Sequence, residues 1–263
     1  MKSALPVVLT IAGFDPSSGA GVTADIKTIA AHGCYGVTCI TALTVQSTRG
    51  VRRVQAVPEG LVQDTLADLI TDCEVRAVRI GMLGSGDVAE TLAIFLERAN
   101  LPNVVLDPIV RASSGADLLG PGGLKVVRDR LLRLATVVTP NVDEAAALTG
   151  KPVRSVTEMR EAAVRLHELG ARNVVVTGGH LAEATDLLST KDGQEEFRAE
   201  HIDSRSTHGT GCAFATAIAC NLALSMSARD AVLAAKAYVR EAILKAYPVG
   251  KGTGPLNHLF KLR

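Results

Sequence analysis

Short apolar runs alternate with amphipathic segments of helical length along the whole chain, and this alternation limits the fold more than any other feature. The first run, residues 5–12, is mostly apolar and rich in β-branched residues, without alternation, which is typical of a strand buried on both faces. Further strands are expected at residues 36–46, 51–57, 77–82, 103–107, 136–139 and 172–177. Strands separated by helices build a largely parallel sheet with helices covering both faces. With 263 residues and no internal repeat, low-complexity tract or linker, the chain is expected to form a single α/β domain, residues 1–263.

The remaining elements follow from the same patterns. Helices are expected at residues 22–32, 58–72, 85–99, 121–133, 156–169, 209–225 and 228–246, with another opening at 140–144. Two late strands, 184–190 and 196–203, are predicted to form a hairpin that turns at Asp192 and Gly193. Residues 250–258 are expected to be a loose, glycine-rich tail. Ligands of such sheets bind beyond the carboxyl ends of the strands, so polar residues there are the candidates for function.

Composition excludes several classes of partner. The net charge is 28 − 27 = +1, which indicates neither a nucleic acid nor a membrane surface as partner. Five scattered cysteines without a CxxC pair predict no disulfide framework and no zinc site, and favour a reducing, cytoplasmic compartment. The N-terminal apolar run is broken by Pro6 and Thr10, so it is read as a buried strand rather than a signal peptide. The most apolar run, 211–224, is interrupted by Asn221 and is too short to span a bilayer.

The segment that opens the helix at 209–225 is a candidate phosphate site. Gly209 and Gly211 let the backbone turn tightly and approach a ligand, and Thr210 and Cys212 fall in the first helical turn. The N–H groups of that turn have no intrahelical partner and lie at the positive end of the helix dipole, where phosphate binds. The same position lowers the pKa of a thiol, so Cys212 is expected to favour the thiolate. Taken alone, the segment equally fits a turn that caps a buried helix.

A second glycine-rich loop, residues 13–21, follows the first strand and precedes a helix. Strand, glycine-rich loop and helix form the phosphate-binding pattern of nucleotide folds. The glycines match neither GxGxxG nor GxxxxGK[ST], so neither motif is assigned.

Seven segments, in order along the chain, together resemble the signatures of the hydroxymethylpyrimidine/phosphomethylpyrimidine kinases of the ribokinase-like superfamily. They are residues 12–28, 40–48, 80–83, 106–108, 139–144, 178–180 and 208–212. The resemblance implies a ribokinase-like three-layer α/β/α fold with a mostly parallel central sheet. It also implies ATP-dependent phosphorylation of 4-amino-5-hydroxymethyl-2-methylpyrimidine and of its monophosphate, in thiamine biosynthesis, with Mg²⁺. Members are commonly dimers, so a homodimer is expected.

On the substrate side the resemblance implies Gln46, Gly13, Asp25, Met82 and Ile109. An amide such as Gln46 carries a donor and an acceptor and can pair with an amino group beside a ring nitrogen, a pairing worth about 1–3 kcal/mol in DNA readout. Gly13 would let the backbone approach the ring, and Met82 would cover its apolar face. The alternatives are an exposed glutamine, a core methionine and, for Asp25, a surface charge on a helix.

On the phosphate side the resemblance implies catalytic residues Gly209–Cys212 and metal ligands Asp107 and Glu144. It implies nucleotide contacts from Thr177, Gly179 and Asn141. Asp107 ends a buried strand, so its charge needs a partner, and Mg²⁺ prefers such hard oxygen ligands. Glu144 alternatively is a first-turn charge stabilised by the helix dipole. As a hypothesis, Cys212 accepts the substrate's hydroxyl proton, although phosphoryl transfer depends mostly on positioning and electrostatics.

The chain departs from the family at Thr177, where many members carry a lysine that would contact ATP phosphates. Lys251 in the tail is one candidate for replacing that charge, and Arg111 is another residue that would reach a phosphate. Two other functions stay open: a pyridoxal/pyridoxine kinase of the same superfamily, and a catalytically weak vitamin-binding protein.

Overall fold

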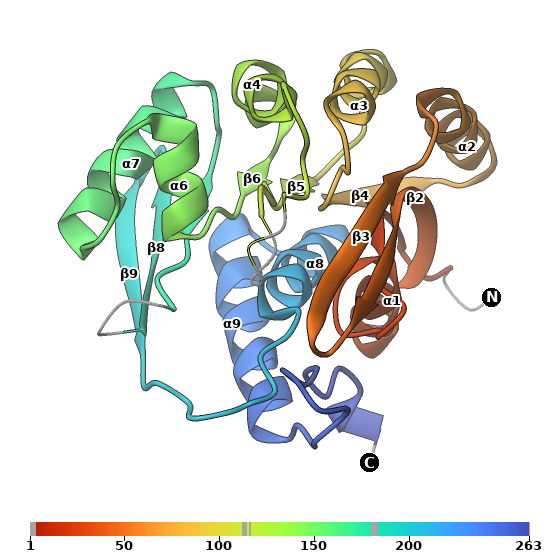
Figure 1. The fold of residues 1–263 in the computed structure, drawn as a ribbon. Coiled ribbons are helices and arrows are strands. Elements are labelled where there is room, and N and C mark those ends of the chain that lie inside the picture. The colour runs from red at the N-terminus through yellow and green to blue at the C-terminus, as the bar shows by residue number, and fades with distance from the viewer. Residues whose placement is uncertain (1–3, 112–114, 116, 180–183, 263) are drawn as a thin grey trace.

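The computed structural model describes residues 4–111, 115, 117–179 and 184–262, and across them nine strands form one sheet (Figure 1). The strands lie in the order β3-β2-β1-β4-β5-β6-β7-β8-β9. Their bounds are β1 Val7–Phe14, β2 Tyr35–Ser47, β3 Gly50–Ala56, β4 Val75–Ile80, β5 Val104–Leu106, β6 Val137–Val138, β7 Val174–Val176, β8 Ala184–Thr190 and β9 Gly193–Ala199. The pairs from β2 to β7 are parallel, while β3, β8 and β9 join antiparallel at the two edges. The expected mostly parallel sheet is confirmed.

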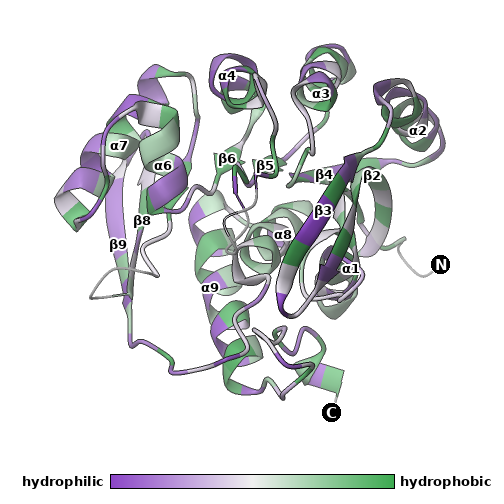
Figure 2. Ribbon diagram, in the orientation of Figure 1, coloured by the Kyte–Doolittle hydropathy of each residue, from purple (hydrophilic) through white to green (hydrophobic). Residues whose placement is uncertain are grey.

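Helices cover both faces of the sheet, so the fold has three layers (Figure 1). The face that packs α1 (Gly21–Ala31), α8 (Thr210–Ala223) and α9 (Ala228–Leu244) has its own apolar core. The other core lies under α2 (Glu59–Asp72), α3 (Gly86–Ala99), α4 (Gly123–Val126), α6 (Val142–Thr149) and α7 (Val156–Glu168). Successive strand residues enter opposite cores: Val8 faces α8, and Leu9 faces the other layer. In Figure 2 the ribbons of α2, α3 and α4 carry hydrophilic residues mainly along their outer sides.

Two expected element boundaries are wrong. Strand β9 spans Gly193–Ala199 rather than 196–203, because Gly193 pairs directly with Thr190, with a φ of +136° that favours glycine, and Ala199 pairs with Ala184 at the start of β8. The helix expected at 121–133 is instead α4, a π-helical turn over Val127–Leu131, and α5 (Leu132–Leu134). Its start is delayed to Gly123 because Gly122 has a left-handed φ of +76°.

The C-terminal segment is not a loose tail. The amide of Thr253 donates to the carbonyl of Thr48 in the β2–β3 turn at 2.9 Å, and the hydroxyl of Tyr238 donates to the carbonyl of His258 at 2.8 Å. Leu256 is buried. These contacts order a glycine-rich sequence that the sequence pattern alone leaves as a coil.

Within the described residues, we find no helix that combines the length and the apolar character needed to cross a bilayer.

Candidate active site

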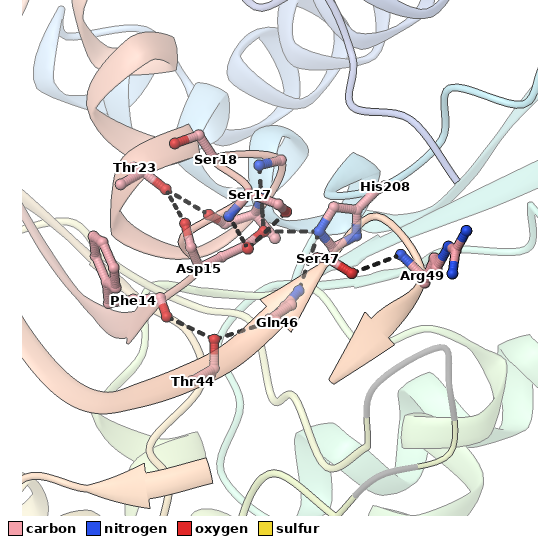
Figure 3. Close-up of polar contacts among 12 residues, drawn as sticks. Phe14, Asp15, Ser17, Ser18, Thr23, Thr44, Gln46, Ser47, Arg49 and His208 are labelled. Atoms are coloured by element: carbon pink, nitrogen blue, oxygen red, sulfur yellow. Dashed lines mark hydrogen bonds and ion pairs between the residues drawn. The ribbon is translucent and has the colours of Figure 1, made fainter. Parts of the chain in front are cut away.

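The N-terminus of α8 lies beside the loop that follows β1 and beside the end of β2. His208, just before the helix, joins them: its Nε2 lies 2.8 Å from Oδ2 of Asp15 and 3.3 Å from the amide Nε2 of Gln46. Figure 3 shows these side chains converging. Segments far apart in the sequence therefore meet at the carboxyl edge of the sheet.

Asp15 shapes the loop after β1 from the inside. Its carboxylate accepts hydrogen bonds from the amide of Ser17 at 2.8 Å, the hydroxyl of Ser17 at 2.7 Å and the amide of Ala20 at 3.0 Å. An aspartate that binds backbone amides a few residues ahead is a common way to close a turn. The glycine-rich loop at 13–21, which matches neither nucleotide-binding motif, is thus held by hydrogen bonds to Asp15 and packs against the start of α8.

Gly209 is the N-cap of α8 and has a φ of +83°. A Cβ at this position would lie 1.8 Å from the carbonyl oxygen of Gly19, so the two glycine-rich loops touch backbone to backbone. A Cβ at Gly211, by contrast, would meet no atom of the described residues within 4 Å. In the part of the chain that the structure describes, Gly211 of the first turn of α8 is therefore uncovered, as an anion site requires.

Alanine at Gly209 is expected to lower kcat by about 10²–10³-fold, the loss typical of removing one oxyanion-stabilising donor, because the loop must move to relieve the clash. Circular dichroism should still show the native helix content, since the change is local. The control is Gly60→Ala, in the first turn of α2, where a Cβ meets nothing within 4 Å. Equal kcat values for Gly209→Ala and wild type would show that this turn takes no part in the chemistry.

The predicted substrate residues Gly13, Met82 and Ile109 lie together. A Cβ on Gly13 would lie 2.8 Å from Sδ of Met82, so the glycine makes room for the thioether. Met82 is part of a small apolar cluster against which Ile109 packs. Gln46 is linked to the same place, because Thr44 bridges between its side chain and the carbonyl of Phe14. Gly13, Met82 and Ile109 thus form one apolar wall, and the Gln46 amide is joined to it through Thr44.

Asp25 does not occupy the expected position facing the substrate. Its side chain has no exposed surface, and it accepts hydrogen bonds from the hydroxyls of Thr10 at 2.6 Å and Thr216 at 2.7 Å. Oδ2 also lies 3.3 Å from a guanidinium nitrogen of Arg79. Its oxygens are therefore committed to a buried network behind the start of α8, and we read it as a support of that network.

Arg79 is the central residue of this network, and the sequence patterns did not single it out. It alternates on β4 with Val78 and Ile80, which enter the opposite core, so its side chain points toward α8. Its Nη2 lies 2.7 Å from Oδ2 of Asp107, and it is fully buried. A Cβ on Gly81 would lie 1.7 Å from its Nη1, so the glycine is needed to accommodate the guanidinium. The available signal was an arginine between two apolar residues, Val78 and Ile80, of a strand expected to be buried.

The buried acids are pushed toward their protonated forms. Burial raises the pKa of Asp107 to about 6, against the pull of Arg79 and with a further push from Asp25. Burial and the charge of Asp107 raise the pKa of Glu144 to about 8, although the Asn141 amide donates to Glu144 at 2.9 Å. Two carboxylates, Asp25 and Asp107, thus flank the buried cation of Arg79, and Glu144 is a further buried acid that interacts with Asp107.

The expectation that Cys212 is a thiolate is wrong for the free protein. Burial raises its pKa to about 11; Arg79 opposes this shift, and Asp107 and Asp25 add to it. Desolvation and two nearby carboxylates outweigh the favourable helix end, because the dipole supplies only a partial charge. Cys212 therefore carries its proton at neutral pH.

The residues predicted to contact the nucleotide also come together. Asn141 and Glu144 form a reciprocal capping box at the start of α6. Glu144 thus lies in the first helical turn, as its alternative interpretation has it, but its raised pKa of about 8 leaves the carboxyl mostly uncharged at neutral pH. Thr177, after β7, donates its amide to the carbonyl of Pro140 at 2.9 Å and pairs with Asn141. Gly179 follows Gly178, whose amide donates to Asp186 at 3.1 Å.

The structure does not bring Lys251 to Thr177: the Lys251 amide donates to the hydroxyl of Thr48 at 3.2 Å, in the β2–β3 turn. A different cation is connected to the Thr177 segment, because Nζ of Lys236 lies 2.5 Å from Oδ2 of Asp186. His180 and residues 112–114, which follow Arg111, lie outside the described residues.

Among the described residues, no set of three or more His, Cys, Asp or Glu side chains is placed to hold a metal ion unaided. Asp107 and Glu144 still fit Mg²⁺, because this ion commonly binds through one or two carboxylates together with substrate phosphates. Two cavities of about 170 and 250 Å³, lined in part by Lys151 and by Asn103, lie elsewhere and include none of the candidate residues.

Helix-end amides, buried carboxylates and a hydrogen-bonding glutamine thus share one edge of a mostly parallel three-layer fold, as in kinases with the ribokinase-like fold. Comparison with known proteins identifies one family among these kinases. A model of the phosphomethylpyrimidine kinase family matches residues 15–257, and the chain belongs to that family.

Individual relatives of the chain carry names from the same family. The hydroxymethylpyrimidine/phosphomethylpyrimidine kinase of Streptomyces coelicolor is 45% identical over 256 residues, which cover 96% of this chain and 94% of that kinase. The thiamine biosynthesis bifunctional protein of Geobacter sulfurreducens is 44% identical over 254 residues, which cover 96% of this chain and 52% of that protein. The chain therefore spans about half the length of this bifunctional relative.

Solved structures confirm the ribokinase-like fold. Bacillus subtilis pyridoxal kinase, in an ADP complex, has a TM-score of 0.90 at 34% identity, with 99% of this chain and 100% of that chain covered. Phosphomethylpyrimidine kinase from Clostridium difficile has a TM-score of 0.81 at 35% identity, with 90% and 99% covered. Because both kinds of vitamin kinase share the fold, the substrate must be argued from the site.

Proposed function

We propose that this kinase uses ATP to phosphorylate 4-amino-5-hydroxymethyl-2-methylpyrimidine and then its monophosphate to the diphosphate, in thiamine biosynthesis. The observation that carries the proposal is the position of Gln46, whose amide contacts the residue just before the open turn of α8. An amide there offers the donor and acceptor that an aminopyrimidine needs. The names of the relatives at 44–45% identity support the same substrate.

The chain's own residues suffice to explain how the reactants are held. Amides of Gly209–Cys212 bind the transferred phosphoryl group, the wall of Gly13, Met82 and Ile109 holds the ring, and Gln46 fixes its orientation. Asn141, Thr177 and Gly179 would contact the nucleotide, and Asp107 and Glu144 would hold Mg²⁺. When bound, Mg²⁺ neutralises charge on the phosphate oxygens. Lys236, held by Asp186 near the Thr177 segment, is the candidate for the positive charge that Thr177 lacks.

Turnover measurements with ATP test this assignment. The pyrimidine alcohol and its monophosphate should be phosphorylated with a higher kcat/KM than pyridoxal or pyridoxine. A preference for the B6 vitamers would favour a pyridoxal kinase. Pyrimidine binding without any turnover would favour a vitamin-binding protein.

The raised carboxyl pKa values predict how pH affects stability. Folded pKa values of about 6 for Asp107 and about 8 for Glu144 lie above their ordinary 3.8 and 4.5, so the unfolded chain loses these protons first as pH rises. The free energy of unfolding should therefore decrease as the pH rises from about 4 to about 8. Thermal unfolding should show this fall, and Mg²⁺ with ATP should raise Tm more at pH 8 than at pH 6.

Glu144→Gln is the matched variant for this prediction, because glutamine keeps the capping box but not the charge. It should show a smaller fall in Tm between pH 5 and pH 8 and a smaller response to Mg²⁺ with ATP. An unchanged pH dependence in this variant would contradict the assignment of Glu144 as the titrating group.

We further propose a homodimer in a reducing, cytoplasmic compartment. The exposed apolar side chains of Tyr35, Leu43 and Val45 on β2 support association of two copies. Light scattering measures the mass of the particle directly, and a monomer at micromolar concentration would contradict the dimer.

A further inference from the structure

His208 contacts two partners through a single ring nitrogen. Its Nε2 lies 2.8 Å from Oδ2 of Asp15 and 3.3 Å from one end of the Gln46 amide, drawn as Nε2 in Figure 3. An imidazole nitrogen either donates a hydrogen bond or accepts one, so it cannot do both at once. The partner that binds Nε2 more strongly therefore determines whether this nitrogen is a donor or an acceptor toward the other partner.

Asp15 is the partner that decides. Burial raises the pKa of Asp15, but hydrogen bonds from His208 and Ser17 outweigh it and leave the pKa below its ordinary value. The carboxylate is therefore ionised and only accepts hydrogen bonds. Nε2 of His208 must therefore carry a hydrogen and donate it to Asp15. An N–H of Gln46 on that side would face another donor, whereas an oxygen there can share the hydrogen as the weaker of two acceptors, so the Gln46 group toward His208 is the oxygen.

The contact with Thr44, at the other end of the Gln46 amide, indicates the same orientation of the amide. Its hydroxyl oxygen lies 2.9 Å from the carbonyl oxygen of Phe14 and 3.1 Å from the second end of the Gln46 amide, drawn as Oε1. The hydroxyl has one hydrogen, and the Phe14 carbonyl can only accept. Thr44 therefore donates to Phe14 and offers a lone pair to Gln46, so the Gln46 group on this side must be a donor.

We infer that His208 and Thr44 hold the Gln46 amide with Oε1 toward His208 and Nε2 toward Thr44, reversed from the orientation drawn. The two ends of an amide have nearly the same shape, so the reversal satisfies every contact without moving a neighbour. His208, fixed by Asp15, is a positioning residue that sets the order of acceptor and donor presented to a ligand.

This order specifies the substrate more closely, and here the inference rests on the proposed function. After its contacts with His208 and Thr44, the amide keeps one lone pair on Oε1 and one hydrogen on Nε2. The substrate's amino group then binds on the His208 side, and its ring nitrogen binds on the Thr44 side. A ring without an amino group next to a ring nitrogen cannot use both.

The position of the hydrogen on His208 is tested first, in the unmodified protein. Histidine-selective ¹⁵N NMR at pH 8, with His208→Gln used to assign the signal among the six histidines, reports which ring nitrogen is protonated. We expect a protonated Nε2. An Nε2 without a hydrogen would overturn the inference, because Gln46 could then donate to it.

Two variants test the effect on specificity. His208→Gln places an N–H donor at similar reach, and His208→Met matches the length without a donor. Calorimetry measures binding of the pyrimidine alcohol and of its analogue that lacks the 4-amino group. The methionine variant should lose about 10–100-fold in affinity for the amino compound and little for the analogue, as expected for a lost bidentate pair. The glutamine variant should recover most of that loss.

The outcomes separate the inference from the proposed function. Equal losses for both ligands, or equal losses in both variants, would show that His208 only supports the loop and would overturn the inference. If the wild type binds neither ligand, the proposed substrate is wrong, and the NMR result alone then decides the amide orientation.

Discussion

Cys212→Ala is expected to lower kcat by about 10²–10⁴-fold, the range for loss of a general base, and to flatten the pH dependence of the reaction. In the free protein the pKa of Cys212 is about 11, so only a small fraction of the thiol is ionised at neutral pH. If Cys212 accepts the substrate's proton, kcat/KM of the wild type should rise about tenfold per pH unit above pH 7, because this parameter follows the free enzyme's ionisations. Steady-state kinetics between pH 7 and pH 9 measure both effects.

Cys220→Ala is the matched control for this prediction. Cys220 lies on the same helix and is also buried, but it packs in the apolar core on that face of the sheet. Its removal should leave the pH profile unchanged. Wild-type turnover and an unchanged profile in Cys212→Ala would refute the proton-accepting role and leave the helix-end amides as the main catalytic groups.

Arg79→Met is expected to destabilise the protein by about 3–5 kcal/mol, the usual result of removing one partner of a buried ion pair. The arginine is fully buried between Asp25 and Asp107, at 3.3 Å and 2.7 Å, and its loss leaves two buried carboxylates without a cation. Urea unfolding at pH 7 measures the free energy directly.

Two further variants make this prediction specific. Arg76→Met removes an exposed arginine of the same strand that pairs with Glu74, and it should change stability by less than about 1 kcal/mol. Adding Asp25→Asn to Arg79→Met should recover part of the loss, because one uncompensated charge is removed. A free energy of unfolding for Arg79→Met within 1 kcal/mol of wild type would contradict the account of the buried network.

The sequence allowed the sheet, its helical layers and the edge that carries the site to be predicted, because alternation and buried apolar runs are local signals. Gly13 lies beside Met82 because they come from the carboxyl ends of the neighbouring strands β1 and β4, and Gln46 lies near the end of β2, the other neighbour of β1. Their roles in substrate binding stay predictions. The single-domain organisation stays a prediction.

What the sequence did not reveal depends on groups brought together only by folding. The pKa of Cys212 is raised mainly by burial, against the pull of Arg79 and with smaller pushes from Asp107 and Asp25, so the helix-end rule alone gave the wrong sign. Asp25 was misplaced for the same reason. The tail was misjudged because its order comes from contacts with Thr48 and Tyr238, not from its own glycines.

The central claim is that the start of α8 binds the terminal phosphoryl group of ATP while Gln46 holds a small heterocyclic alcohol opposite it. A crystal structure with the pyrimidine alcohol and a non-hydrolysable ATP analogue tests it most directly. The account predicts the terminal phosphate within hydrogen-bonding distance of the amides of Gly209–Cys212, with the pyrimidine amino group on the Gln46 side chain. Clear density for either ligand away from this edge of the sheet would contradict it.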